Sequence, residues 1–177
     1  YDMREPFYHV AGGLQDNGVW TGPSRVRGSQ ILIDDWRFIQ NGDGYYAISH
    51  PDNPDLFLSD YQAGGIQATN LQTYEQREAS PQVKRMDGYS ADSNKVRFNW
   101  NAPIVKSPHD GKVVYFAGNI VYRSIDWGKT WTAISGDLSK NDKSRQGDAG
   151  GPVLKENTVA EYYGNVFSFA ESPVQKG

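Results

Sequence analysis

Three aspartates, Asp16, Asp43 and Asp60, are the residues of this chain whose type and position could carry catalysis. Asp16 and Asp43 lie in turn sequences rich in Asn and Gly, and Asp60 follows a short apolar run. Two carboxyl groups about 5 to 9.5 Å apart across a cleft can cleave a glycosidic bond. One of them donates a proton, and the other activates water or attacks the sugar. The three aspartates are the candidates that the chain offers for such a pair, and the sequence contains no complete catalytic set.

Polar and aromatic residues beside the same turns form a candidate ligand-binding set. Carboxylates and amides can orient a sugar or a peptide, and exposed aromatic rings can stack on its apolar faces. These residues also have a structural interpretation, because turns require Asn and Gly and aromatic rings pack between sheets. The candidate set consists of Gln15, Asn17, Asp43, Tyr61, Gln62, Asn99, Trp100 and Asn101.

The sequence has no recognisable pattern for a metal or a cofactor. His9, His50 and His109 lack the spacing of metal ligands, and the absence of Cys excludes thiolate sites and disulfides. The acidic residues of segment 141–148 do not follow the order of an EF-hand loop. We therefore expect no metal and no cofactor.

The elements that position these residues are predicted to be short strands. With 19 Gly, 11 Tyr, 5 Trp and only 2 Met, the composition is typical of an all-β chain with many turns. The net charge is only −3, and Lys and Arg do not cluster among aromatic residues as they do in nucleic-acid-binding proteins. No window approaches the roughly 18 consecutive apolar residues of a membrane-spanning helix. We expect neither a nucleic-acid partner nor a membrane span.

Two sets of repeated segments indicate a repeat architecture. The segments 11–15, 63–67 and 117–121 begin with Ala-Gly, lie roughly 50 residues apart and each follow an apolar run. Each is predicted to form a strand, a tight glycine turn and a second strand. In the second set, Pro51, Pro108 and Pro173 each end a short apolar strand and begin a turn.

One complete repeat is predicted to contain strands 44–50, 56–61, 65–69 and 74–79, and the next contains strands 103–106, 112–117, 120–124 and 130–134. Four antiparallel strands in about 50 residues are typical of a β-propeller blade, whereas the rungs of a β-solenoid are shorter. We therefore predict a partial propeller of about three blades. Its divisions are the end of one blade (1–35), a complete blade (36–82), a second complete blade (83–138), a polar loop (139–160) and the first strand of another blade (161–177).

An Asp-box motif, Ser-x-Asp-x-Gly-x-Thr-Trp, follows the third strand of the second complete repeat. The aspartate can accept hydrogen bonds from the turn, the glycine can adopt positive φ, and the tryptophan can pack between blades. We interpret this motif as structural rather than catalytic. Its five defining residues are Ser124, Asp126, Gly128, Thr130 and Trp131.

The Asp-box and the segments 12–24 and 99–104 resemble bacterial sortilin-like and glycosyl-hydrolase-like proteins of the sialidase-like superfamily, which carry BNR (Asp-box) repeats. The resemblance implies an exported protein, secreted, periplasmic or on the cell surface. It also implies that the Asp-box lies at the turn between the third and fourth strands, opposite the face that binds ligand. Related xyloglucan-hydrolysing propellers carry a catalytic Asp followed closely by Gly-Gly, and segment 60–65 is a longer variant of that motif.

These features predict a fragment of a larger propeller. The first hypothesis is a binding or scaffold module for a glycan, a peptide or a protein on the face opposite the Asp-box. The alternatives are part of a glycoside hydrolase and a piece without activity in isolation. Because two or three blades leave apolar faces uncovered, we expect the isolated chain to self-associate, most simply as a homo-oligomer.

Overall fold

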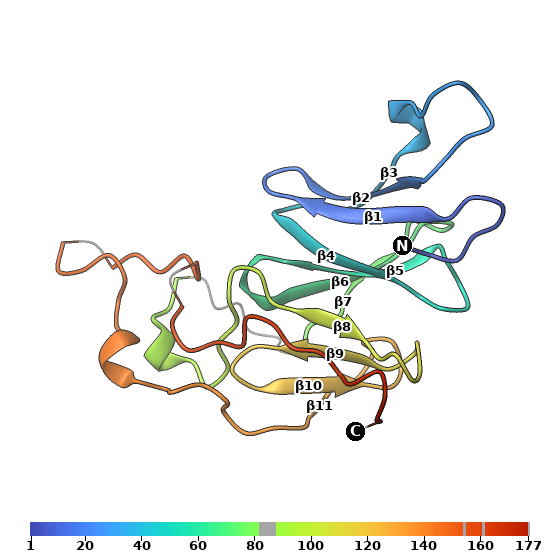
Figure 1. Ribbon diagram of the computed structural model, residues 1–177. Coiled ribbons are helices and arrows are strands. Elements are labelled where there is room, and N and C mark those ends of the chain that lie inside the picture. The colour runs from blue at the N-terminus through green and yellow to red at the C-terminus, as the bar shows by residue number, and fades with distance from the viewer. Residues whose placement is uncertain (82–87, 154, 161, 177) are drawn as a thin grey trace.

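The computed structural model describes residues 1–81, 88–153, 155–160 and 162–176. Within them the chain forms three antiparallel sheets, of three, four and four strands, and the helical elements are single turns of 3-10 helix. The sheets lie one above another (Figure 1). The all-β prediction is confirmed, and none of these sheets closes on itself. No helix in the described residues is long and apolar enough to cross a membrane.

The first sheet consists of β1 (His9–Leu14), β2 (Gly18–Pro23) and β3 (Arg37–Gln40), in that order. β3 pairs with β2, so the sheet continues past residue 35, where the sequence analysis ended the first blade. A single 3-10 turn, η1 (Ile33–Asp35), precedes β3.

The first repeated Ala-Gly segment does not form the predicted glycine turn. Ala11, Gly12 and Gly13 lie inside β1 and pair with residues of β2. The turn comes after Leu14, where Asp16 adopts positive φ. Gly13 remains in the strand because β1 packs directly on β4 there, and a Cβ on Gly13 would lie 2.0 Å from the carbonyl carbon of Gly44. In this copy the glycine therefore permits close packing between sheets rather than a turn.

The second sheet follows the prediction strand by strand. Its order is β4 (Gly44–Ser49), β5 (Leu56–Tyr61), β6 (Gly65–Asn70) and β7 (Gln76–Glu78). The 3-10 turn η2 (Gln62–Gly64) joins β5 and β6, so the second Ala-Gly segment does form a turn.

The third sheet repeats this order with shorter strands, which are β8 (Ile104–Lys106), β9 (Val114–Ala117), β10 (Val121–Ser124) and β11 (Thr132–Ala133). Each lies within its predicted range. The third Ala-Gly segment spans the end of β9 and the turn into β10.

Among the described residues the core consists of two apolar clusters. The smaller cluster joins the first and second sheets through Val19, Ile39 and Phe57. The larger cluster joins the second and third sheets and includes Leu58 and Phe116. Contacts of β4 with β1 and with β8 place the first strands of the three sheets next to one another.

The rest of the described residues are irregular and include the 3-10 turns η3 (Ala91–Ser93) and η4 (Lys143–Arg145). The guanidinium of Arg97, which is almost fully buried, donates to Asp137 at 2.7 Å and so anchors the segment before β8 to the segment after β11. Residues 162–176 contain no assigned strand, although a strand was predicted there. The amide of Val166 donates to the carbonyl of Gly118, and Figure 1 shows this red segment beside the third sheet. The predicted boundaries at 82–83 and 161 fall outside the described residues.

Candidate functional site

The turns of the sheets form two opposite edges, which differ in chemistry. One edge, the Asp43 edge, contains the turns where Leu14 pairs with Gly18 and Tyr61 pairs with Gly65. The opposite edge, the Asp-box edge, contains the turn after Ser124, which lies beside the far ends of the second sheet's strands. Most of the candidate ligand-binding residues lie on or near the Asp43 edge.

A chain of hydrogen bonds joins three turns along the Asp43 edge. The amide of Asp16 donates to Oδ1 of Asp43 at 2.8 Å, and the amide of Asp43 donates to Oε1 of Gln62 at 3.0 Å. The backbone reinforces this link, because the amide of Gly18 donates to the carbonyl of Gly42 at 2.9 Å. The first and second sheets therefore contribute residues to one continuous surface.

Asp43 is buried in this chain, whereas Asp16 is exposed and adopts a φ of 63°. A residue with positive φ in a turn can present its side chain outward, and Asp tolerates this conformation better than most residues. Of these two carboxylates, that of Asp16 is thus the one that a ligand can reach directly.

Asp60 lies behind this surface and is fully buried. Its Oδ1 accepts the amide of Tyr46 at 2.5 Å, and the backbone of Ala102 also donates to its carboxyl group. Its Oδ2 has no hydrogen-bond partner among the described residues. Burial raises the pKa of Asp60 well above its ordinary value, and the backbone donors only partly offset this effect. The carboxyl group therefore favours its neutral form.

Tyr45 connects the three aspartates electrostatically, although the sequence analysis did not select it. Its hydroxyl is buried and has no partner among the described residues. Burial and the charges of Asp43, Asp60 and Asp16 raise the pKa of Tyr45 to about 12. All three candidate carboxyl groups thus lie near enough to one hydroxyl to disfavour its ionisation. The alternation of side chains along 44–49 was the available signal, because it places Tyr45 and Tyr46 on opposite faces of the strand.

Residues 99–101 approach Asp60 from the segment before β8. The Oδ1 of Asn101 is buried without a partner among the described residues, and Trp100 packs against the larger core cluster. Asn99 accepts the amide of Asn101 at 3.4 Å. Trp100 and Asn101 are therefore partly committed to packing.

The other selected residues do not all join this group. The hydroxyl of Tyr61 donates to Glu78 at 2.6 Å, toward a separate cavity of about 230 Å³. Gln15 and Asn17 are exposed in the β1–β2 turn, where the side-chain amide of Asn17 donates to the carbonyl of Gln15 at 3.0 Å. The structure thus brings Asp16, Asp43, Asp60 and Gln62 together and places Tyr61 elsewhere.

The Asp-box turn connects β10 to β11. Asp126 accepts the side-chain hydroxyls of Ser124 and Thr130 at 2.8 and 2.6 Å, and it also accepts the amides of Lys129 and Thr130. Burial alone would raise the pKa of Asp126, but these hydrogen bonds outweigh burial and lower it to about 2. The oxygens of Asp126 are therefore occupied by the turn itself.

The same turn fastens the third sheet to the second. The indole N–H of Trp131 donates to the carbonyl of Ala79 at 2.6 Å. In return the guanidinium of Arg77 donates to the carbonyls of Trp127 and Gly128 at 3.1 and 3.0 Å. Gly128 has a φ of 71°. These contacts between the second and third sheets give the Asp-box a structural role.

His, Asp and Glu side chains within the described ranges form no group of three that could hold a metal ion. No protein-family model and no curated protein matches this chain.

Proposed function

We propose that this chain is part of an exported, sortilin-like Asp-box β-propeller that binds a glycan at its Asp43 edge. The strand order supports the propeller, because the second and third sheets each contain four consecutive strands in sequence order. Contacts of β4 with β1 and with β8 agree with first strands that line a common axis. The Asp-box at the turn between the third and fourth strands of its sheet also agrees with that architecture.

The hydrogen-bonded chain from Asp16 through Asp43 to Gln62 is the observation that carries the proposed binding site. It joins turns from two sheets and fixes the backbone of Asp16, whose side chain is exposed. A site whose polar groups are fixed before binding loses little conformational entropy when a ligand arrives.

A glycan fits this edge better than a peptide or a protein surface. Its hydroxyl groups can donate to the Asp16 carboxylate and can exchange hydrogen bonds with the amides of Gln15 and Asn17, which are exposed. Several ordered hydrogen bonds to neutral hydroxyls suit an edge that offers mainly acceptors and amides.

Glycan binding can be tested with the Asp16→Asn variant. The variant removes the accessible charge but retains an acceptor and tolerates positive φ, so its fold should be preserved. We expect the affinity for the glycan that binds best in an oligosaccharide panel to fall about tenfold, because hydrogen bonds to charged groups are worth more than neutral ones. Isothermal titration calorimetry would measure the change.

Asp110→Asn is the matched control, because Asp110 lies in the β8–β9 turn, where its side chain accepts the amide of Lys112 and its backbone carbonyl accepts that of Val113. It should bind as the parent does. Equal affinities of the parent and Asp16→Asn would contradict the proposed site, and binding of peptides without any glycan would refute the ligand class.

Hydrolysis of a glycosidic bond is the second candidate, because the raised pKa of Asp60 favours the neutral form that a general acid requires. The complete burial of Asp60 weighs against this role, since a catalytic acid must reach the glycosidic oxygen. Release of reducing ends from the bound glycan, lost in Asp60→Asn and in Asp16→Asn, would favour hydrolysis over binding alone.

A further inference from the structure

The first sheet has no counterpart to the first strand of the other sheets among the described residues. The hairpin of β1 and β2 pairs along its whole length on either side of residues 15–17, and the hairpin of β5 and β6 does the same on either side of residues 62–64. In the second sheet β4 pairs with β5 in front of that hairpin, whereas β1 is an edge strand. β1 therefore corresponds to the second strand of a four-stranded sheet.

The open edge of β1 offers backbone groups to a further strand. Asp2 occupies the start of this edge, because its amide donates to the carbonyl of His9 at 3.0 Å and its Oδ1 accepts the amide of His9 at 2.7 Å. Alternate residues of a strand direct their backbone groups to the same side, so those of Ala11 and Gly13 face this edge too. They form no hydrogen bond with the backbone of another described residue. An edge of this kind is a template for a strand from another chain.

Segment 166–172 lies on the third sheet at the opposite end of the stack, and it belongs to no sheet of the described residues. At its start the amide of Val166 donates to the carbonyl of Gly118 at 2.9 Å, in the β9–β10 turn. At its end the carbonyl of Ser172 accepts Nε2 of His109 at 2.8 Å, in the β8–β9 turn. The segment therefore spans the third sheet from one edge to the other.

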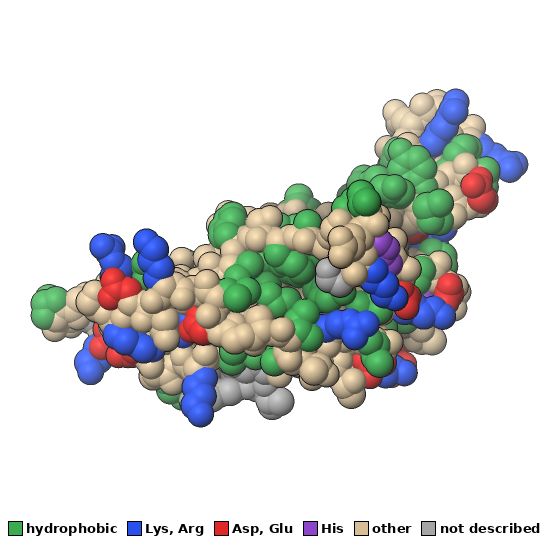
Figure 2. All heavy atoms as spheres, turned by 60° about the horizontal axis from the view of Figure 1, so that its bottom comes forward, with side chains coloured by type: hydrophobic (Ala, Val, Ile, Leu, Met, Phe, Trp, Pro, Cys, Tyr) green, Lys and Arg blue, Asp and Glu red, His purple; other side chains and the backbone are tan. Residues whose placement is uncertain are grey.

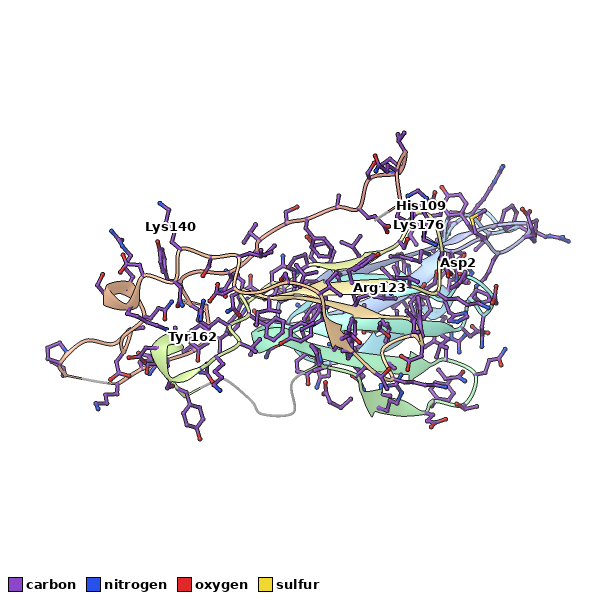
Figure 3. The ribbon with its side chains drawn as sticks, turned by 90° about the horizontal axis from the view of Figure 1, so that it is seen from below. Asp2, His109, Arg123, Lys140, Tyr162 and Lys176 are labelled. Carbon is purple, nitrogen blue, oxygen red and sulfur yellow. The ribbon has the colours of Figure 1, made fainter. Side chains whose placement is uncertain are left out.

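This segment also runs in the direction of a first strand. Figure 3 shows Tyr162 and Lys176 at opposite ends of the sheets, with His109 at the end where Lys176 lies. β8, the first strand of the third sheet, likewise runs from the β9–β10 turn toward the β8–β9 turn. The segment thus has the place and the direction of the first strand of a further sheet.

The contact at Val166 has a counterpart at each earlier sheet. The amide of Gly18, in the hairpin of the first sheet, donates to the carbonyl of Gly42 just before β4. The carboxyl group of Asp60, near the hairpin of the second sheet, accepts the amide of Ala102 just before β8. Each hairpin is therefore bonded to the residues that lead into the next first strand, and the third hairpin is bonded to the start of segment 166–172.

We propose that two copies of this chain exchange segment 166–172, and that each copy adds it to the open edge of the other's β1. One chain cannot close this contact by itself, because its second sheet lies between its first sheet and the segment (Figure 1). With the exchange each chain contributes three complete four-stranded sheets and a pair contributes six, within the range of about four to eight blades in a propeller. The inference rests on the propeller architecture proposed above and is independent of the glycan.

The second sheet supplies the register of this exchange. Ile48 of β4 pairs with Leu58 of β5. Ile48 and Ala170 each lie three residues before a repeated proline, and Leu58 and Ala11 each lie three residues before the end of their strand. Ala170 of one copy is therefore opposite Ala11 of the other, where its amide donates to the outward-facing carbonyl of Ala11.

The side chains agree with this register. Ala11 packs against the smaller core cluster, on the side of its own second sheet, whereas Gly12 is exposed on the outer face. In the donated segment Phe169 faces its own third sheet, where its ring lies 6.1 Å from that of Tyr115. The register places Phe169 opposite Gly12, and directly opposite residues share a face. A Cβ on Gly12 would meet nothing within 4 Å, so the ring has space there.

Introduced cysteines test the exchange directly, because the chain contains no Cys. In the double variant Ala11→Cys, Ala170→Cys, the two new thiols of one chain lie on opposite sides of the second sheet and can meet only in a pair of chains. The control double variant, Ala11→Cys, Val174→Cys, moves the second thiol past Pro173, to a residue that is 92% exposed. After mild oxidation, a non-reducing gel measures the covalent pair.

We expect at least about tenfold more covalent pairs from the first double variant than from the control, because opposite residues lie about 5.5 Å apart, within reach of a disulfide. Equal yields from the two, or no covalent pair from the first, would overturn the exchange. Ala11→Cys alone and Ala170→Cys alone should give no more than the control.

Ala170→Pro removes the amide that donates to Ala11, and a proline inside a strand prevents pairing. Light scattering should show a mass shifted from two chains toward one, whereas Val174→Pro should remain paired. Circular dichroism would establish that both variants fold. A folded Ala170→Pro variant that stays paired like the parent would refute the exchange.

Glycan titration of Ala170→Pro keeps this inference separate from the proposed function, because Asp16, Asp43 and Gln62 are joined within one chain. We expect the unpaired variant to bind glycan as the parent does. A parent that forms the covalent pair but binds no glycan would overturn the glycan site alone.

Discussion

At the scale of single residues, Asp60 is the candidate residue whose chemistry the sequence predicted least well. Its carboxyl group accepts backbone amides from Tyr46 in β4 and from Ala102 before β8, so it links the second and third sheets from inside. Burial penalises ionisation of this group by removing it from water, and no cation among the described residues pairs with it to offset that penalty. A neutral acceptor of the same shape would make the same links without a charge.

Asp60→Asn should therefore stabilise the fold near neutral pH, by about 1 to 3 kcal/mol if the amide keeps both acceptor contacts. The folded-state pKa of Asp60 is raised, so its contribution to stability is present below pH 3.8 and lost as the pH rises through the folded pKa. The advantage of the variant should shrink as the pH approaches 3.8. Urea unfolding of both proteins at several pH values measures this trend, and a parent that is more stable than the variant at neutral pH would contradict it.

The sequence predicted part of the candidate site at this scale. Asp16 and Asp43 were selected as turn residues, and the structure joins them by a hydrogen bond. The environment of Asp60 was not predictable, because one of its backbone donors, Ala102, comes from a distant segment. Tyr61 was selected beside Gln62, but Tyr61 ends β5 and donates to Glu78, whereas Gln62 begins the turn η2 and accepts the amide of Asp43.

At the scale of elements, the contact between β1 and β4 depends on the absence of side chains. A Cβ on Gly13 would lie 2.0 Å from the carbonyl carbon of Gly44, whereas a Cβ on Gly12 would meet nothing within 4 Å. Both glycines lie in the same strand, and neither has positive φ. They form a matched pair for testing how closely the first two sheets pack.

Gly13→Ala should destabilise the fold by about 2 kcal/mol or more, because the two backbones must separate. Gly12→Ala should change the free energy of unfolding by less than about 1 kcal/mol, and in the stabilising direction, since Ala loses less backbone entropy than Gly. Chemical denaturation measures both. Similar values for the two variants would mean that the sheets do not meet at Gly13.

The strands of the second and third sheets were predictable because apolar runs alternate regularly with turn residues there. β5 (Leu56–Tyr61) begins and ends at its predicted residues. β3 was missed because Arg37–Gln40 is short and its pairing with β2 spans a long irregular connection. The first Ala-Gly segment was assigned to a turn because sequence alone does not distinguish a glycine that turns the chain from one that permits close packing.

At the scale of the whole molecule, the two outer faces of the sheet stack are open. On the first sheet, Trp20 pairs with Phe38 across the strands, and their rings lie 5.0 Å apart on the face away from the second sheet. Val10 and Phe38 on that sheet are 38% and 43% exposed. On the opposite side of the stack, Figure 2 shows apolar side chains across the middle of the face, with charged side chains toward both ends. Such extended apolar faces are unusual on monomers.

We therefore expect the isolated chain to self-associate through the outer face of its first sheet. Multi-angle light scattering should give a mass above that of one chain, and Phe38→Asp should shift the mass toward the monomer because association would bury an unpaired charge. Tyr74→Asp is the control, since Tyr74 is exposed in the β6–β7 turn, away from this face. A monodisperse parent monomer would contradict self-association. Dissociation by both variants would mean that added negative charge, rather than the aromatic face of the first sheet, controls assembly.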